Sequence, residues 1–130
     1  MTEEMLYNTI DRDMTFAGID FHEISPNLMR RNKRLKIFDE FDIVLKNGDT
    51  IALIEIKHKV RTTDIKRMLE AKLHNYKALF PEYSSYKLLL GIGGGSFDPE
   101  AESDAINNGI GIIKLVNDKV EYYTDNIKVF

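Results

Sequence analysis

A hairpin signature between residues 38 and 59 constrains the fold of this chain more than any other feature. Two runs rich in Ile, Val and Leu flank Asn47-Gly48, in the sequence FDEFDIVLKNGDTIALIEIKHK. An Asn-Gly pair between two such runs is a strong short-range signal for a β-hairpin. Both predicted strands also carry charged side chains, and the register of the hairpin decides which of these meet.

A two-residue turn at Asn47-Gly48 places Asp42 opposite Leu53 and Glu40 opposite Glu55. Residues that face each other across a strand pair share one face of the sheet, and a four-residue turn keeps the same parity. Asp42 and Glu55 then become diagonal neighbours, about 7–8 Å apart at the backbone. One predicted face carries the charged residues Glu40, Asp42, Glu55 and Lys57. The other carries the predicted core residues Phe41, Ile43, Ala52, Ile54 and Ile56.

Two carboxylates this close repel each other unless a cation or a proton lies between them. Because the chain has no Cys, oxygen ligands indicate Mg²⁺ or Mn²⁺ rather than Zn²⁺. Lys57 would then lie beside the metal, where an ammonium can orient a water or stabilise charge on a phosphate. The alternative is that Glu40, Glu55, Lys57 and Lys59 form salt bridges on a solvated face, each contributing little to stability.

The remaining sequence predicts an α/β fold with a mixed sheet flanked by helices, in one domain spanning residues 1–130. Residues 28–37 are basic and read as an edge strand or an extended loop, and turns are expected at 25–27 and 93–97. Amphipathic spacing and capping signals predict helices at 3–13, 62–80 and 98–107. Apolar runs predict strands within 15–24, at 86–92, at 110–116 and near 120–124.

The spacing Asp-x12-Glu-x-Lys on two paired strands resembles the PD-(D/E)xK nuclease superfamily. The element order over residues 35–116 is similar to its restriction-endonuclease-like αβββαβ core. This resemblance implies a Mg²⁺- or Mn²⁺-dependent phosphodiesterase, with Asp42 and Glu55 as metal ligands and Lys57 as the catalytic lysine. A catalytically silent module of the same fold, which binds nucleic acid or dimerises, is the alternative.

The chain departs from the superfamily pattern at two places. Phe41 stands where the name-giving Pro often does. Many members also add a Glu from the first helix, and the candidates for it here are Glu3, Glu4 and Glu23.

Charge is distributed unevenly along the chain, which has a formal net charge of -3. Basic residues are concentrated around the predicted hairpin, and such a local field attracts a polyanion. We expect nucleic acid as the partner, most readily DNA, although RNA and the need for a second subunit or partner domain stay open. The predicted phosphate-binding residues are Arg30, Arg31, Lys33, Arg34, Lys59 and Arg61. The lack of Cys, of a signal peptide and of a long apolar run favours a cytoplasmic protein.

Overall fold

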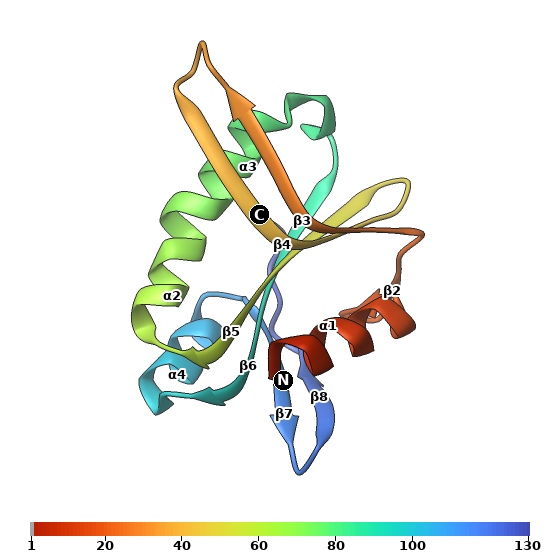
Figure 1. Ribbon diagram of the computed structural model, residues 1–130, viewed down its shortest axis with the longest axis vertical. Coiled ribbons are helices and arrows are strands. Elements are labelled where there is room, and N and C mark those ends of the chain that lie inside the picture. The colour runs from red at the N-terminus through yellow and green to blue at the C-terminus, as the bar shows by residue number, and fades with distance from the viewer. Residues whose placement is uncertain (1) are drawn as a thin grey trace.

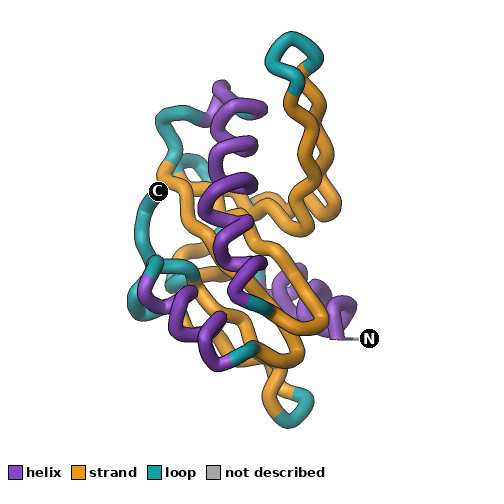
Figure 2. The backbone as a smooth tube through the Cα atoms, turned by 90° about the vertical axis from the view of Figure 1, so that its left-hand side faces the viewer, coloured by secondary structure: helices purple, strands orange, loops and turns teal. Residues whose placement is uncertain are grey.

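The computed structural model describes residues 2–130 and contains a six-stranded mixed sheet with helices on both faces (Figures 1 and 2). The sheet order is β3-β4-β5-β6-β7-β8. The strands are β3 (Glu23–Asn32), β4 (Ile37–Lys46), β5 (Thr50–Val60), β6 (Lys87–Phe97), β7 (Gly111–Val116) and β8 (Lys119–Tyr123). The pairs β5–β6 and β6–β7 are parallel, and the other pairs are antiparallel. The predicted α/β class with a mixed sheet is confirmed.

Helices provide the two crossovers that the parallel strands require. The helical elements are α1 (Thr2–Asp13), α2 (Thr62–Arg67), the π-helical turn η1 (Met68–Lys72), α3 (Leu73–Leu79), the 3₁₀ turn η2 (Pro81–Tyr83) and α4 (Pro99–Asn107). A separate small hairpin joins β1 (Thr15–Phe16) to β2 (Ile19–Asp20). Within residues 2–130, no helix is both long enough and apolar enough to cross a membrane.

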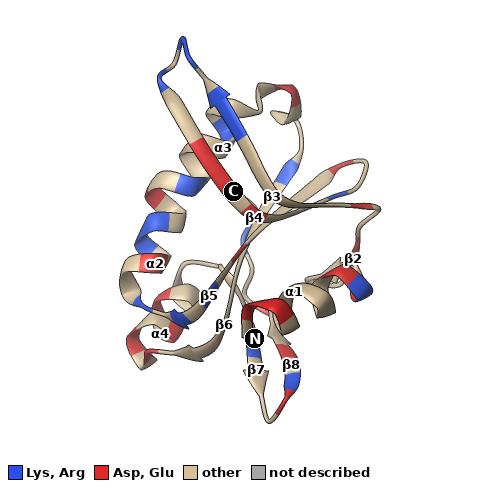
Figure 3. Cartoon of the chain, viewed as in Figure 1, with Lys and Arg blue, Asp and Glu red and all other residues tan. Residues whose placement is uncertain are grey.

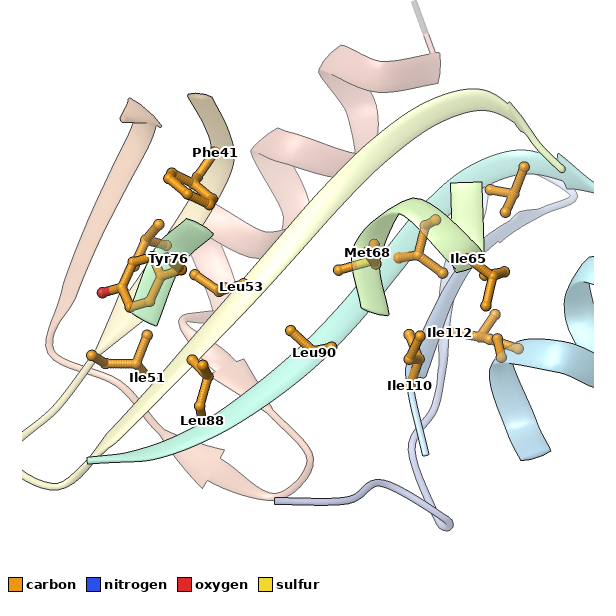
Figure 4. Close-up of a cluster of buried hydrophobic side chains, with 14 of the residues drawn as sticks. Phe41, Ile51, Leu53, Ile65, Met68, Tyr76, Leu88, Leu90, Ile110 and Ile112 are labelled. Atoms are coloured by element: carbon orange, nitrogen blue, oxygen red, sulfur yellow. The ribbon is translucent and has the colours of Figure 1, made fainter. Parts of the chain in front are cut away.

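Two apolar cores sandwich the sheet, so its central strands are buried on both faces. The first core lies between the sheet and the layer formed by α2, α3 and α4, and includes Phe41, Leu53 and Tyr76 (Figure 4). The second lies under α1 and includes Ile43 and Ile54. Burial on both faces explains the nearly continuous apolar runs of β5 and β6. It also corrects the predicted core face, because Phe41 packs in a different core from Ile43.

The turn of the central hairpin differs from the two-residue turn that the sequence predicted. Lys46 pairs with Ile51, so four residues form the connection. The side-chain oxygen of Asn47 accepts hydrogen bonds from the backbone N–H groups of Asp49 at 2.9 Å and Thr50 at 2.7 Å. These bonds offer the chain an alternative to a tight type I′ turn. The parity of the strands is kept, but the register shifts by two residues.

Two segments predicted as turns are strand instead. Residues 25–27 lie inside β3, where Pro26 is tolerated because β3 is an edge strand. Residues 93–97 continue β6 alongside β5. A β-carbon at Gly94 would lie 2.8 Å from the Val60 side chain, and one at Gly95 would lie 2.7 Å from Thr2. The glycines therefore permit close packing rather than a change of direction.

Candidate functional site

Asp42 and Glu55 lie side by side where the β4–β5 ladder opens. The ladder runs from Lys46↔Ile51 to Ile43↔Ile54, and one further step places Asp42 opposite Glu55. The predicted pairings of Asp42 with Leu53 and of Glu40 with Glu55 are therefore wrong, and Asp42 lies directly across from Glu55 rather than diagonal to it.

Two backbone hydrogen bonds hold this carboxylate pair. The Asp42 N–H donates to Glu55 Oε2 at 3.1 Å, and the Ile56 N–H donates to Asp42 Oδ2 at 2.9 Å. Each carboxylate thus accepts a hydrogen bond from a backbone N–H of the opposite strand, in the place that a backbone carbonyl takes in a regular ladder. Asp42 Oδ1 takes no part in these two bonds, and Glu55 Oε1 faces Lys72 Nζ at 3.6 Å, so the opened ladder presents carboxylate oxygens from adjacent strands.

The surroundings of Glu55 disfavour its ionised form. Its side chain is buried, with 5% of the residue exposed. Burial and then the charge of Asp42 raise the pKa of Glu55 to about 6, and Lys72 and Lys57 offset this only in part. A cation placed at the carboxylates would stabilise the ionised form of Glu55.

Lys72 is a buried cation behind the carboxylate pair. Its Nζ lies 2.7 Å from Asp39 Oδ1 and 3.6 Å from Glu55 Oε1, and it also donates to the Glu40 carbonyl. Burial alone would raise the pKa of Asp39, but hydrogen bonds from Lys72, Asn75 and the Glu40 N–H together lower it. Lys72 therefore ties the helical layer to both strands of the site.

The π-helical turn η1 ends at Lys72. The Leu73 N–H donates to the Met68 carbonyl, five residues earlier, so one extra residue is accommodated in the turn. Such π-bulges often occur at functional sites. The sequence interpretation missed Lys72, although its place between Met68 and Tyr76 puts a lysine in the apolar stripe of the helix. A charged residue at a core position was the signal available.

One open cleft of about 360 Å³ joins the predicted charged residues. Glu40, Asp42, Glu55 and Lys57, which the sequence placed on one face, all line it. Four further residues complete the lining: Phe38, Asp39, Arg67 and Lys72.

A second cleft of about 420 Å³ borders Asp42 on the α1 side of the sheet. Glu3 and Glu4 of α1 line it together with Asp42, so the first helix brings acids towards the carboxylate pair. Glu23, the third first-helix candidate, instead lies 3.1 Å from Lys46 in an ion pair.

The six predicted phosphate-binding residues separate into two places on the molecule. Arg31, Lys33 and Arg34 lie at the β3–β4 turn, whereas Lys59 and Arg61 lie at the β5–α2 junction, and basic residues thus flank the carboxylates (Figure 3). Lys59 pairs with Asp98 at 3.3 Å. Arg30 is a structural residue as well as a basic one. Its guanidinium stacks 3.9 Å above Phe80 and binds Glu82 at 2.7 Å.

The carboxylate oxygens of Asp42 and Glu55 are of the kind that a divalent cation binds. Mg²⁺ and Mn²⁺ prefer oxygen ligands and are commonly held by one or two carboxylates, with water or substrate filling the other positions. Asp42 and Glu55 meet that need, although residues 2–130 contain no group of three or more His, Cys, Asp or Glu side chains arranged to hold a metal. The pair therefore fits a cation that shares its coordination with solvent or a phosphate.

Comparison of the chain with protein-family models, with curated proteins and with solved structures gives no match. Membership of the PD-(D/E)xK superfamily therefore stays a prediction. It rests on the spacing of Asp42, Glu55 and Lys57 and on the order of the helices and strands.

Proposed function

We propose that this protein is a metal-dependent nuclease that hydrolyses phosphodiester bonds in nucleic acid. The observation that carries the proposal is the carboxylate pair of Asp42 and Glu55, which faces the same cleft as Lys57 and in which burial and the charge of Asp42 raise the pKa of Glu55. The arrangement of β3, β4 and β5, followed by α2–α3, β6, α4 and β7, supports it, because it is similar to the restriction-endonuclease-like αβββαβ core.

In this proposal Asp42 and Glu55 hold a Mg²⁺ or Mn²⁺ ion, with Glu3 or Glu4 able to add a ligand through water. The bound ion supplies Lewis-acid activation of the phosphate and of the attacking water. Lys57 donates hydrogen bonds to the phosphate oxygens and stabilises the negative charge that develops on them. Water forms the new P–O bond, the bond to one sugar oxygen breaks, and that oxygen leaves as an alcohol with one of the water's protons.

Lys72 has a positioning role in the same proposal. Its ammonium lies behind Glu55 and binds Asp39 and the Glu40 carbonyl, so it holds β4 against the helical layer beside the site. Its charge also limits the pKa of Glu55. This keeps Glu55 available as an anionic ligand near neutral pH.

Cleavage of supercoiled plasmid DNA and of labelled oligonucleotides in Mg²⁺ or Mn²⁺ tests the proposal. We expect metal-dependent nicking by the wild-type protein and at least a ~100-fold slower reaction for Asp42→Asn and Lys57→Met. This magnitude is that of losing one group that stabilises transition-state charge. Asp125→Asn is the matched control, because Asp125 is an exposed acid remote in sequence from the site.

A silent nucleic-acid-binding module of the same fold is the second candidate. The proximity of Lys72 to Glu55 favours it, because an ammonium can compensate carboxylate charge without a metal. Nucleic-acid binding without cleavage in either metal, on every DNA and RNA substrate tested, would support this candidate over the nuclease.

A further inference from the structure

The β3–β4 hairpin projects from the molecule as a basic arm, formed by residues 31–38 (Figures 1 and 2). Its base is anchored to the helical layer at one cross-strand pair. On β3, Arg30 donates to the Leu79 carbonyl at 3.0 Å and pairs with Glu82. On β4, its partner Asp39 binds Lys72 and Asn75. The arm therefore extends from a fixed base.

Four basic side chains crowd the arm, and no acid lies among its eight residues. They are all exposed: Arg31, Lys33, Arg34 and Lys36. Within residues 2–130 none of the four takes part in an ion pair. Their charge is therefore available to a polyanionic partner.

Local contacts fix the shape of the arm before any partner arrives. The Asn32 side chain accepts a hydrogen bond from the Leu35 N–H at 3.0 Å, and the Lys36 N–H donates to the Lys33 carbonyl. The Arg31 guanidinium lies 4.7 Å from the centre of the Phe38 ring across the strand pair. A preformed turn loses less conformational entropy on binding than a disordered one.

The dimensions of the arm suit the major groove of B-form DNA. Two strand residues on each side continue beyond the anchored pair, which at about 3.3 Å per residue adds about 7 Å, and the turn of residues 33–36 extends the arm further. The major groove is about 12 Å wide and 8.5 Å deep and admits a two-stranded β-ribbon. The major groove of A-form RNA is too narrow for such an element.

The arm is continuous with the carboxylate cleft. Phe38 lines that cleft and also a smaller cleft at the tip, beside Arg31 and Lys33. Asp42 lies four residues further along the same strand. A nucleic acid held by the arm would therefore lie beside the cleft that contains Asp42 and Glu55.

We infer that the arm inserts into the major groove of double-stranded DNA and presents an adjacent phosphodiester to the carboxylate cleft. The inference rests on the proposed function for the identity of the polyanion. It adds the form of the substrate, duplex DNA in preference to duplex RNA. It also assigns Arg31, Lys33, Arg34 and Lys36 to groove and phosphate contacts.

Fluorescence anisotropy in EDTA, between about 50 and 200 mM salt, separates binding from cleavage. The ligands are a 20-bp DNA duplex, an RNA duplex of the same sequence, and vesicles containing anionic lipid. We expect the wild-type protein to bind DNA at least about tenfold more tightly than RNA, because only the B-form groove admits the ribbon.

Replacement of the four arm residues by Ser should reduce the slope of log affinity against log salt by about 3 to 4, since each phosphate contact contributes about 0.9. The matched control removes four exposed lysines elsewhere, at positions 77, 87, 119 and 128, and should change the slope much less. Any one of three results would overturn the inference. The first is an equal reduction of the salt slope in both variants, the second is equal affinity for DNA and RNA, and the third is binding of vesicles but not of DNA. Arm-dependent DNA binding without cleavage in either Mg²⁺ or Mn²⁺ would refute the nuclease proposal alone.

Discussion

Substitution of Glu55 by Gln tests whether burial and the neighbouring charge of Asp42 make the ionised form of Glu55 destabilising. The pKa of Glu55 is about 6, against an ordinary value of 4.5. Since one pKa unit corresponds to about 1.4 kcal/mol, the ionised side chain disfavours the native state by about 2 kcal/mol. Between these two pH values the native protein binds more protons than the unfolded chain. The free energy of unfolding therefore falls as pH rises through this window.

Urea denaturation in EDTA, followed by circular dichroism from pH 4 to pH 7, measures this effect. From pH 4 to pH 7 the free energy of unfolding of the wild-type protein should fall by about 2 kcal/mol relative to that of Glu55→Gln, because the two proteins share every other titrating group. A difference that does not change with pH would refute the reasoning. A wild type that gains relative stability as pH rises would do the same, since Lys72 would then fully compensate Glu55.

Three further substitutions test the packing around the site, each by urea denaturation at pH 7. Lys72→Met leaves the buried Glu55 and the part-buried Asp39 without their cation and should lower the free energy of unfolding by about 3–5 kcal/mol; a loss below about 1 kcal/mol would contradict the role of Lys72 in this network. Gly91→Ala places a β-carbon 2.7 Å from the Phe16 ring and should cost about 1–3 kcal/mol. Its control Gly48→Ala meets no atom within 4 Å and should change stability by less than about 0.5 kcal/mol. Asn47→Ala removes the two hydrogen bonds that its side chain accepts in the turn and should lower the free energy of unfolding by about 1–3 kcal/mol. An unchanged free energy of unfolding would show that these bonds do not stabilise the turn.

The sequence predicted the main helices and strands because their signals are local. The apolar runs of β5 and β6 and the capping signals before α4 depend on residues close in the chain. The parity of the paired segment, from Lys46↔Ile51 to Ile43↔Ile54, was predictable for the same reason. Glu40, Asp42, Glu55 and Lys57 do line one cleft, although the alternation of β4 breaks between Phe41 and Ile43.

The register of that hairpin was not predictable from the Asn-Gly signal alone. Asn-Gly favours a type I′ turn through positive backbone φ angles, but neither residue has a positive φ here. The Asn47 side chain instead closes a longer turn. The longer turn shifts the register by two residues, and this shift places Asp42 directly opposite Glu55 instead of diagonal to it.

Lys72 and the anchored arm depend on contacts between segments far apart in the chain. Lys72 meets Asp39 across 33 residues, and Arg30 meets the Leu79 carbonyl across 49. Neither contact leaves a local pattern, apart from the lysine within an apolar stripe. Tertiary structure was therefore needed to divide the basic residues into a structural Arg30 and a free arm.

The central claim is that Asp42 and Glu55 bind a divalent cation, and calorimetric titration with Mn²⁺ at pH 7.5 tests it most directly. The account predicts one site per chain in the wild-type protein. Affinity should fall at least about tenfold in Asp42→Asn, because one of two carboxylate ligands is lost, and should be unchanged in Asp125→Asn. No binding by the wild-type protein, or equal binding by all three proteins, would contradict the claim.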